Sequence, residues 1–105
     1  MAVFPYPNTP RAVYRTATDS TPGTVVAITI PDWARVVTVT FTTNEGKLYT
    51  NSDEKDNGHY VPVPAGSDYE FNVSGGQQPA QISTIWIDST VASTVATIVA
   101  ESAVR

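Results

Sequence analysis

The stretch Arg35-Val-Val-Thr-Val-Thr-Phe-Thr-Thr43 decides how this sequence is expected to fold. Its apolar residues Val37, Val39 and Phe41 alternate with threonines. Successive side chains of a β-strand point to opposite faces of a sheet, so this pattern places one face in a core and the other against water or another protein. The stretch Ser67–Val73 alternates in the same way, and both can bury a consistent face only as strands. The residues expected to be buried are Val37, Val39, Phe41, Tyr69, Phe71, Ile85 and Ile87.

Short β-branched segments bounded by turn residues follow one another from Thr24 onward. They are Thr24–Ile30, Arg35–Thr43, Lys47–Thr50, Tyr60–Val63, Ser67–Val73, Gln81–Asp88 and Thr90–Ala100. The turn Asn44-Glu45-Gly46 predicts a hairpin between the second and third segments, and the last two segments are expected to form a closing pair. Together they predict an all-β protein, an antiparallel β-sandwich or barrel of about seven strands.

Two segments do not fit a simple strand pattern. Asn51–Gly58 is strongly polar and is expected to be a solvated loop. Residues 90–100 can be read in two ways, because Val91, Val95, Ile98 and Val99 would also share one face of a helix. We expect a strand, since β-branched residues dominate this segment and Asp88-Ser89 makes a compact turn before it.

Residues 1–23 differ from the rest and predict an extended, proline-rich N-terminal arm, followed by a single β-sandwich domain over residues 24–105. Prolines at positions 5, 7, 10 and 22 remove backbone donors, which excludes a helix or a central strand. A disordered tail is the alternative interpretation. The arm also carries the apolar residues Phe4, Tyr6, Val13 and Tyr14, which suit a partner-binding role. Deleting residues 1–15 is therefore expected to leave the domain folded.

Composition limits the classes of function. The chain has 105 residues, of which only 15% are charged, and its net charge is −4 with six scattered basic residues, so nucleic acid is not expected as a partner. There is no cysteine to form a disulfide or a thiolate metal site. The N-terminus lacks the pattern of a signal peptide, and no apolar run has the length of a membrane span, so we expect a soluble protein with no membrane partner.

Residues that could perform catalysis or bind a metal are sparse. His59 is the only histidine, and no Gly-x-Ser-x-Gly motif occurs. Asn51–His59 is rich in oxygen ligands, but alignment of Asp53 with the first position of a calcium loop places Pro64 where a bidentate glutamate is needed. We therefore predict no catalytic residue, no metal site, no cofactor and no enzymatic activity.

Aromatic residues allow one further function. Sugar-binding sandwiches stack pyranose rings on exposed aromatic side chains, and the candidates here are Tyr49, Tyr60, Tyr69, Trp33 and Trp86. Trp33 follows Pro31-Asp32 in a turn and is expected to be exposed, whereas the strand that carries Trp86 is apolar on both faces. Core or interface packing is the favoured role for these aromatics, and a carbohydrate-binding or host-receptor-binding module is kept as the alternative function.

The pattern Tyr60-Val-Pro-Val-Pro-Ala-Gly-Ser-Asp-Tyr-Glu-Phe71, the later Gln81-Ile-Ser-Thr-Ile-Trp-Ile-Asp88 and the ending Val99-Ala-Glu-Ser102 resemble small β-rich virion proteins of tailed bacteriophages. The resemblance covers roughly the last half of the chain and is not a strict motif. It implies a capsid decoration or head-associated protein located on the virion, made in the host cytoplasm, with the major capsid protein as partner. It also implies a homo-oligomer, and a cyclic trimer is the form we expect, because such an assembly can bury neutral Thr-rich faces. Phe4, Tyr6, Val13, Tyr14 and Trp33 are the expected partner-binding residues.

Overall fold

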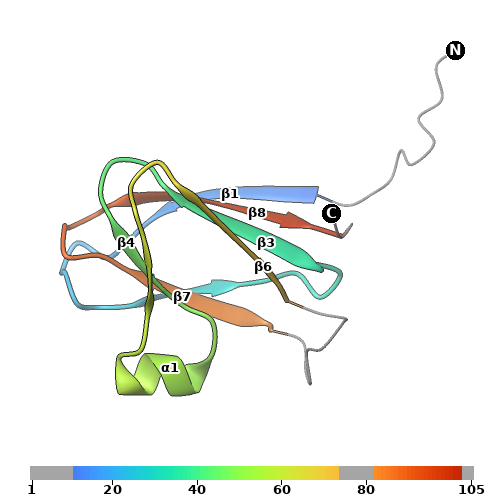
Figure 1. The fold of residues 1–105 in the computed structure, drawn as a ribbon, viewed down its shortest axis with the longest axis horizontal. Helices are drawn as coiled ribbons and strands as arrows, with labels where there is room; N and C mark the ends of the chain where they lie inside the picture. The colour runs from blue at the N-terminus through green and yellow to red at the C-terminus, as the bar shows by residue number, and fades with distance from the viewer. Residues whose placement is uncertain (1–10, 74–81, 103–105) are drawn as a thin grey trace, which may run out of the picture.

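The computed structural model describes residues 11–73 and 82–102, and within these residues it has eight strands and one short helix (Figure 1). In chain order these are β1 (Arg11–Ala17), β2 (Val26–Thr29), β3 (Val36–Phe41), β4 (Gly46–Tyr49), α1 (Ser52–Asn57), β5 (Val61–Val63), β6 (Asp68–Asn72), β7 (Thr84–Asp88) and β8 (Val95–Glu101). The predicted all-β fold is confirmed, with eight strands where about seven were expected.

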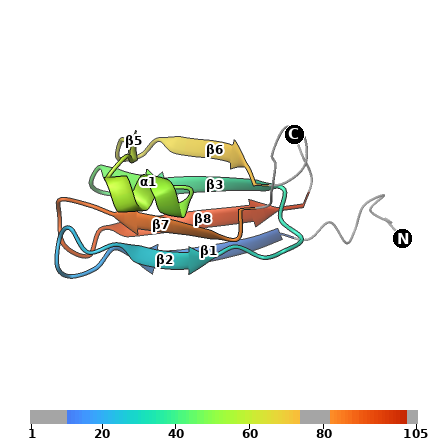
Figure 2. The same ribbon diagram turned by 90° about the horizontal axis from the view of Figure 1, so that it is seen from below.

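The strands form two antiparallel four-stranded sheets. Sheet A has the order β1-β8-β3-β6, and sheet B has the order β2-β7-β4-β5. The pairs are nested, because β1 pairs with β8, β2 with β7, β3 with β6 and β4 with β5. This is the strand order of a double-sheet jelly roll. The two sheets lie as layers over one another in Figures 1 and 2.

The core lies between the two sheets and is built from the inward-facing half of each alternating strand. Val37, Val39, Phe41, Ile85 and Ile87 are fully buried, as their alternation predicted. The position of Phe41 also explains why residue 46 is a glycine, because a β-carbon there would overlap the Phe41 ring. The aromatic pair of β6, Tyr69 and Phe71, is only partly buried and packs against the rim of this core.

The N-terminal boundary that we predicted is wrong. Arg11–Ala17, expected in an arm outside the domain, is β1 and pairs with β8 along its whole length, from Arg11 opposite Glu101 to Ala17 opposite Val95. The flanking prolines led to the wrong boundary, since Pro10 and Pro22 border this segment but none lies within it. An edge strand needs hydrogen-bond partners on one side only, so proline next to it is tolerated.

Two predicted strand pairings are also wrong. β3 and β4 do not form a hairpin, because β3 lies in sheet A and β4 in sheet B. The same is true of β7 and β8, which pair with β4 and β3 and not with each other. Residues 89–94 are the connection between these last two strands, and the strand expected from Thr90 begins only at Val95. Consecutive strands therefore cross from one sheet to the other, except β4 and β5, which pair within sheet B.

The polar segment predicted as a loop contains the helix α1. Asn51 has an extended backbone and caps it, with the Asn51 Oδ1 atom accepting a hydrogen bond from the Glu54 backbone N–H at 2.8 Å. Gly58 ends it in the left-handed conformation, with φ 71°. The spacing Asn-x-x-Glu before a glycine was a signal for these caps. The helix lies on the outer side of sheet B in both views.

Candidate functional site

The outer face of sheet A is a regular surface made by four strands. We use this name for the outward side chains of its four strands, which the register arranges in rows. The two central rows are Val13–Val99–Thr38–Glu70 and Arg15–Thr97–Thr40–Asp68, each read from β1 across β8 and β3 to β6. Val39 of β3 and Ile98 of β8 are buried in the core. The residues next to them along each strand therefore point to the outer face.

In the two central rows of this face, charge is confined to the two edges, whereas in the next row Glu101 of the central strand β8 forms an ion pair with Arg11 of β1 at 3.8 Å. β1 contributes Arg11 and Arg15, both exposed, and β6 contributes Asp68 and Glu70, also exposed. The central strands β8 and β3 contribute half-buried valines and threonines in the two central rows. The Asp68 carboxylate accepts a hydrogen bond from the Thr40 hydroxyl at 2.6 Å, which keeps Asp68 turned toward the face. The two central rows are thus neutral in the middle, basic at the β1 edge where Arg15 lies and acidic at the β6 edge.

Thr38 lies at the centre of this face. Its side chain is only half-buried, yet its hydroxyl oxygen is covered by neighbouring atoms and has no hydrogen-bond partner. It is the only such side-chain atom within residues 11–73 and 82–102. A covered polar atom without a hydrogen-bond partner costs free energy. Because the Thr38 hydroxyl is covered, it adds no polar atom to the exposed surface at the centre of this face.

The outer side of sheet B is covered by α1 and an aromatic cluster. Tyr49 packs on Tyr60 edge to face, with ring centroids 6.1 Å apart. Two lysines lie over rings of this cluster, with the Lys55 ammonium 5.2 Å from the centre of Trp86 and the Lys47 ammonium 4.7 Å from that of Tyr60. Such contacts are worth about 0.5–1 kcal/mol at exposed sites, so the contact of Lys55 with Trp86 helps to hold α1 on the sheet.

A shallow pocket of about 110 Å³ lies beside this cluster. It is lined by Glu45, Lys47, Tyr60 and Thr90. Tyr60 is 42% exposed and is the most exposed aromatic side chain among the described residues. The pocket is below the roughly 300 Å³ at which small-molecule sites usually begin, so it could receive only part of a ligand.

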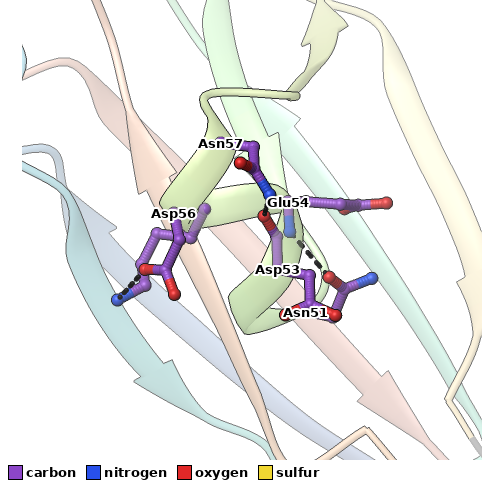
Figure 3. Close-up of polar contacts among 6 residues, drawn as sticks. Asn51, Asp53, Glu54, Asp56 and Asn57 are labelled. Carbon is purple, nitrogen blue, oxygen red and sulfur yellow. Dashed lines mark hydrogen bonds and ion pairs between the residues drawn. The ribbon is translucent and has the colours of Figure 1, made fainter.

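The polar groups of α1 contact one another, as Figure 3 shows. Besides the Asn51 cap, the Asn57 side-chain amide donates to the Asp53 carbonyl oxygen at 2.8 Å, and Lys55 and Asp56 form an ion pair at 3.3 Å. Nowhere in residues 11–73 and 82–102 do three or more metal-ligating side chains gather. His59 is exposed. These contacts account for the segment as a capped helix.

The structure separates the residues predicted to bind a partner. Val13 is exposed on the outer face of sheet A, whereas Tyr14, its neighbour, points inward and packs against the core. Tyr14 is therefore wrong as an exposed contact residue, because alternation in β1 turns it away from the surface. Trp33 is 36% exposed and lies in the β2–β3 connection. Phe4 and Tyr6 lie outside the described residues.

Sequence reasoning missed the charged edges of sheet A, and it considered Tyr60 only as one of several aromatic residues that could bind a sugar. Arg11 and Arg15 alternate with Ala12 and Tyr14, a period of two that could have predicted an outward row of β1. The order of strands across the sheet was not readable, and this order is what places the acidic residues of β6 at the opposite edge. Tyr60 gave no signal beyond its residue type.

The chain matches no protein-family model, and no curated protein or solved structure is significantly similar to it. Within the part of the chain that the structure describes, no helix is long and apolar enough to span a membrane.

Proposed function

We propose that this protein is a non-enzymatic structural component of a tailed-bacteriophage virion that binds and stabilises the outer surface of the capsid. The resemblance of its second half to small β-rich virion proteins suggests this role. The strand order adds support, since jelly rolls occur in viral capsid proteins and in lectins. A fold hosts many functions, so the proposal depends on a surface as well.

The observation that carries the proposal is the open edge formed by β1. This strand is seven residues long, pairs only with β8 among the strands of residues 11–73 and 82–102, and exposes 55% of Val13. Open edges can add a strand from another protein through backbone hydrogen bonds. The other edges are shorter, and β5 has Pro62 within its three residues. β1 is therefore the best-suited edge for attachment to a shell.

The segment that precedes β1 would extend this contact. It carries Phe4 and Tyr6, and two docked aromatic rings would contribute several kcal/mol at roughly 25 cal/mol per Å² of buried apolar surface, before ordering costs. In this proposal the β1 edge supplies backbone hydrogen bonds and the preceding segment supplies apolar anchors. The major capsid protein is the partner.

The test is co-sedimentation with empty capsids assembled from the major capsid protein that the same genome encodes. We expect saturable binding and a higher melting temperature of the capsids. Val13→Asp and deletion of residues 1–10 should each weaken binding. Val91→Asp is the matched control, because Val91 is a similarly exposed valine, 44%, in the β7–β8 connection. Native protein that stays in the supernatant at every concentration would reject the capsid-binding role.

A carbohydrate- or receptor-binding module is the second candidate, and the pocket beside Tyr60 is the observation that favours it. The sequence suggested Trp33 and nearby tyrosines for this contact, and in this candidate the sugar would stack on Tyr60. Titration with a panel of glycans, followed by heteronuclear NMR shifts, tests it. Binding that is lost in Tyr60→Ala and kept in Trp33→Ala supports this candidate. The Lys47 ammonium already lies over the Tyr60 ring, which makes stacking of a sugar less favourable.

A further inference from the structure

We propose that the outer face of sheet A is a contact between two copies of this chain, related by a two-fold axis that runs parallel to the strands between β8 and β3. The proposal does not depend on attachment to a capsid. It follows from how charge is arranged across the face. Arg15 lies at the β1 edge and Asp68 at the β6 edge of the same row, with Thr97 and Thr40 between them.

The direction of the axis follows from these edges. A two-fold axis parallel to the strands reverses the order of strands in the second copy, so that its β6 lies over β1 of the first. Arg15 of each copy then faces Asp68 of the other, and the contact occurs twice. An axis in the same plane but perpendicular to the strands would place Arg15 over Arg15, with like charges opposed. Charge complementarity therefore selects the first arrangement.

The middle of the face suits burial against a copy of itself. Val99, Thr97, Thr38 and Thr40 carry no charge, so their contact requires no charged group to lose water. Protein interfaces have this pattern, with few charges at the centre and polar groups at the rim. Antiparallel sheets pack face to face with strands aligned within about 30°, which the proposed axis allows.

The symmetry closes after two copies, because the same surface is used on both sides. This differs from the cyclic trimer expected from the sequence, in which each copy would use two different surfaces. One face of a four-stranded sheet is small for a stable interface, so we expect association that depends on protein concentration. Because its selective contacts are charges at the rim, we also expect association to weaken as salt is raised.

The experiment uses the full chain and sedimentation equilibrium over a range of concentrations. Arg15→Glu and Asp68→Arg should each weaken self-association at least about fivefold, because each replaces two attractive contacts by repulsive ones. An equimolar mixture of these two variants should associate as a heterodimer, since Glu at position 15 would then face Arg at position 68, and the native Arg15 would face the native Asp68. The double variant should also self-associate again.

Asp56→Arg is the control for Asp68→Arg. It makes the same change in net charge on α1, which lies on the other sheet, and should leave association unchanged. A native chain that sediments as a monomer at all concentrations, or as a trimer, would overturn the proposal whatever the variants do. A mixture that fails to associate while both variants give native circular dichroism would overturn it as well.

Discussion

Thr18 and Thr94 exchange two hydrogen bonds although 76 residues separate them in the chain. The Thr18 backbone N–H donates to the Thr94 carbonyl oxygen at 2.8 Å, and the Thr94 N–H donates to the Thr18 hydroxyl at 2.8 Å. Both residues are buried. The contact joins the β1–β2 connection to the β7–β8 connection at one end of the sandwich, so it fixes the relation of the first and last strands.

Thr18→Val should therefore lower the free energy of unfolding by about 1–3 kcal/mol, because the buried Thr94 N–H loses its acceptor while side-chain volume is kept. Urea denaturation followed by circular dichroism measures the change. Thr42→Val is the control, since Thr42 is exposed and its backbone bond to Val95 does not involve the side chain. Equal stability of the two variants would show that the Thr18 hydroxyl does not act as this acceptor.

Gly46→Ala should be more damaging than its size suggests. The added methyl group would overlap the ring of Phe41, which is fully buried and cannot move without disturbing the core. We expect a loss of about 1–3 kcal/mol or more, measured by thermal unfolding. Gly23→Ala separates this effect from backbone strain, because Gly23 has φ 95° and open space around it. A smaller loss at position 46 than at position 23 would contradict the packing role of Gly46.

The sequence predicted the faces of the strands far better than their partners. Alternation along a strand is a local property, so the burial of Val37, Val39 and Phe41 could be read directly. Partners in a jelly roll are distant, as with Arg11 opposite Glu101, and the turn after Phe41 looks the same whether the chain forms a hairpin or crosses to the other sheet. The sequence therefore showed where the turns lie but not which strands pair.

The candidate surface could not be predicted for the same reason, because it depends on which strands lie side by side in the sheet. Trp33 could be predicted as exposed, and it is. Val13 was predicted only as a partner-binding residue of an arm, and the structure exposes it on the face of a sheet. The opposition of Arg15 and Asp68 across one face depends on the lateral order of four strands, which no local pattern encodes. Tyr14 was misassigned because β1 was taken for an arm, in which alternation has no meaning.

Asn51→Ala should loosen α1 and cost about 0.5–2 kcal/mol, because the Glu54 backbone N–H loses its cap. The Lys55 ammonium lies over Trp86, so loosening the helix should also change the emission of that tryptophan. Fluorescence in a Trp33→Phe background, which leaves Trp86 as the single tryptophan, measures this change. Asn51→Asp should preserve the emission, since aspartate caps a helix equally well. An unaltered spectrum in Asn51→Ala would contradict the role of the cap.

Two N-terminal truncations test where the domain begins. Removing residues 1–10 leaves all of β1 in place, so we expect little change in the free energy of unfolding. Removing residues 1–17 deletes the strand that pairs with β8 and the Tyr14 ring that packs against the core, so we expect a loss of several kcal/mol or failure to fold.

The comparison decides between an arm and a strand. A deletion of residues 1–15 was expected to be harmless while this segment was considered an arm, but it removes five of the seven residues of β1, Arg11 to Arg15. Urea titration of the three truncated proteins should show a sharp drop once the deletion passes Arg11. If stability instead stays constant through residue 17, β1 contributes nothing to the fold, and the open edge proposed for capsid attachment would have to be sought at β8.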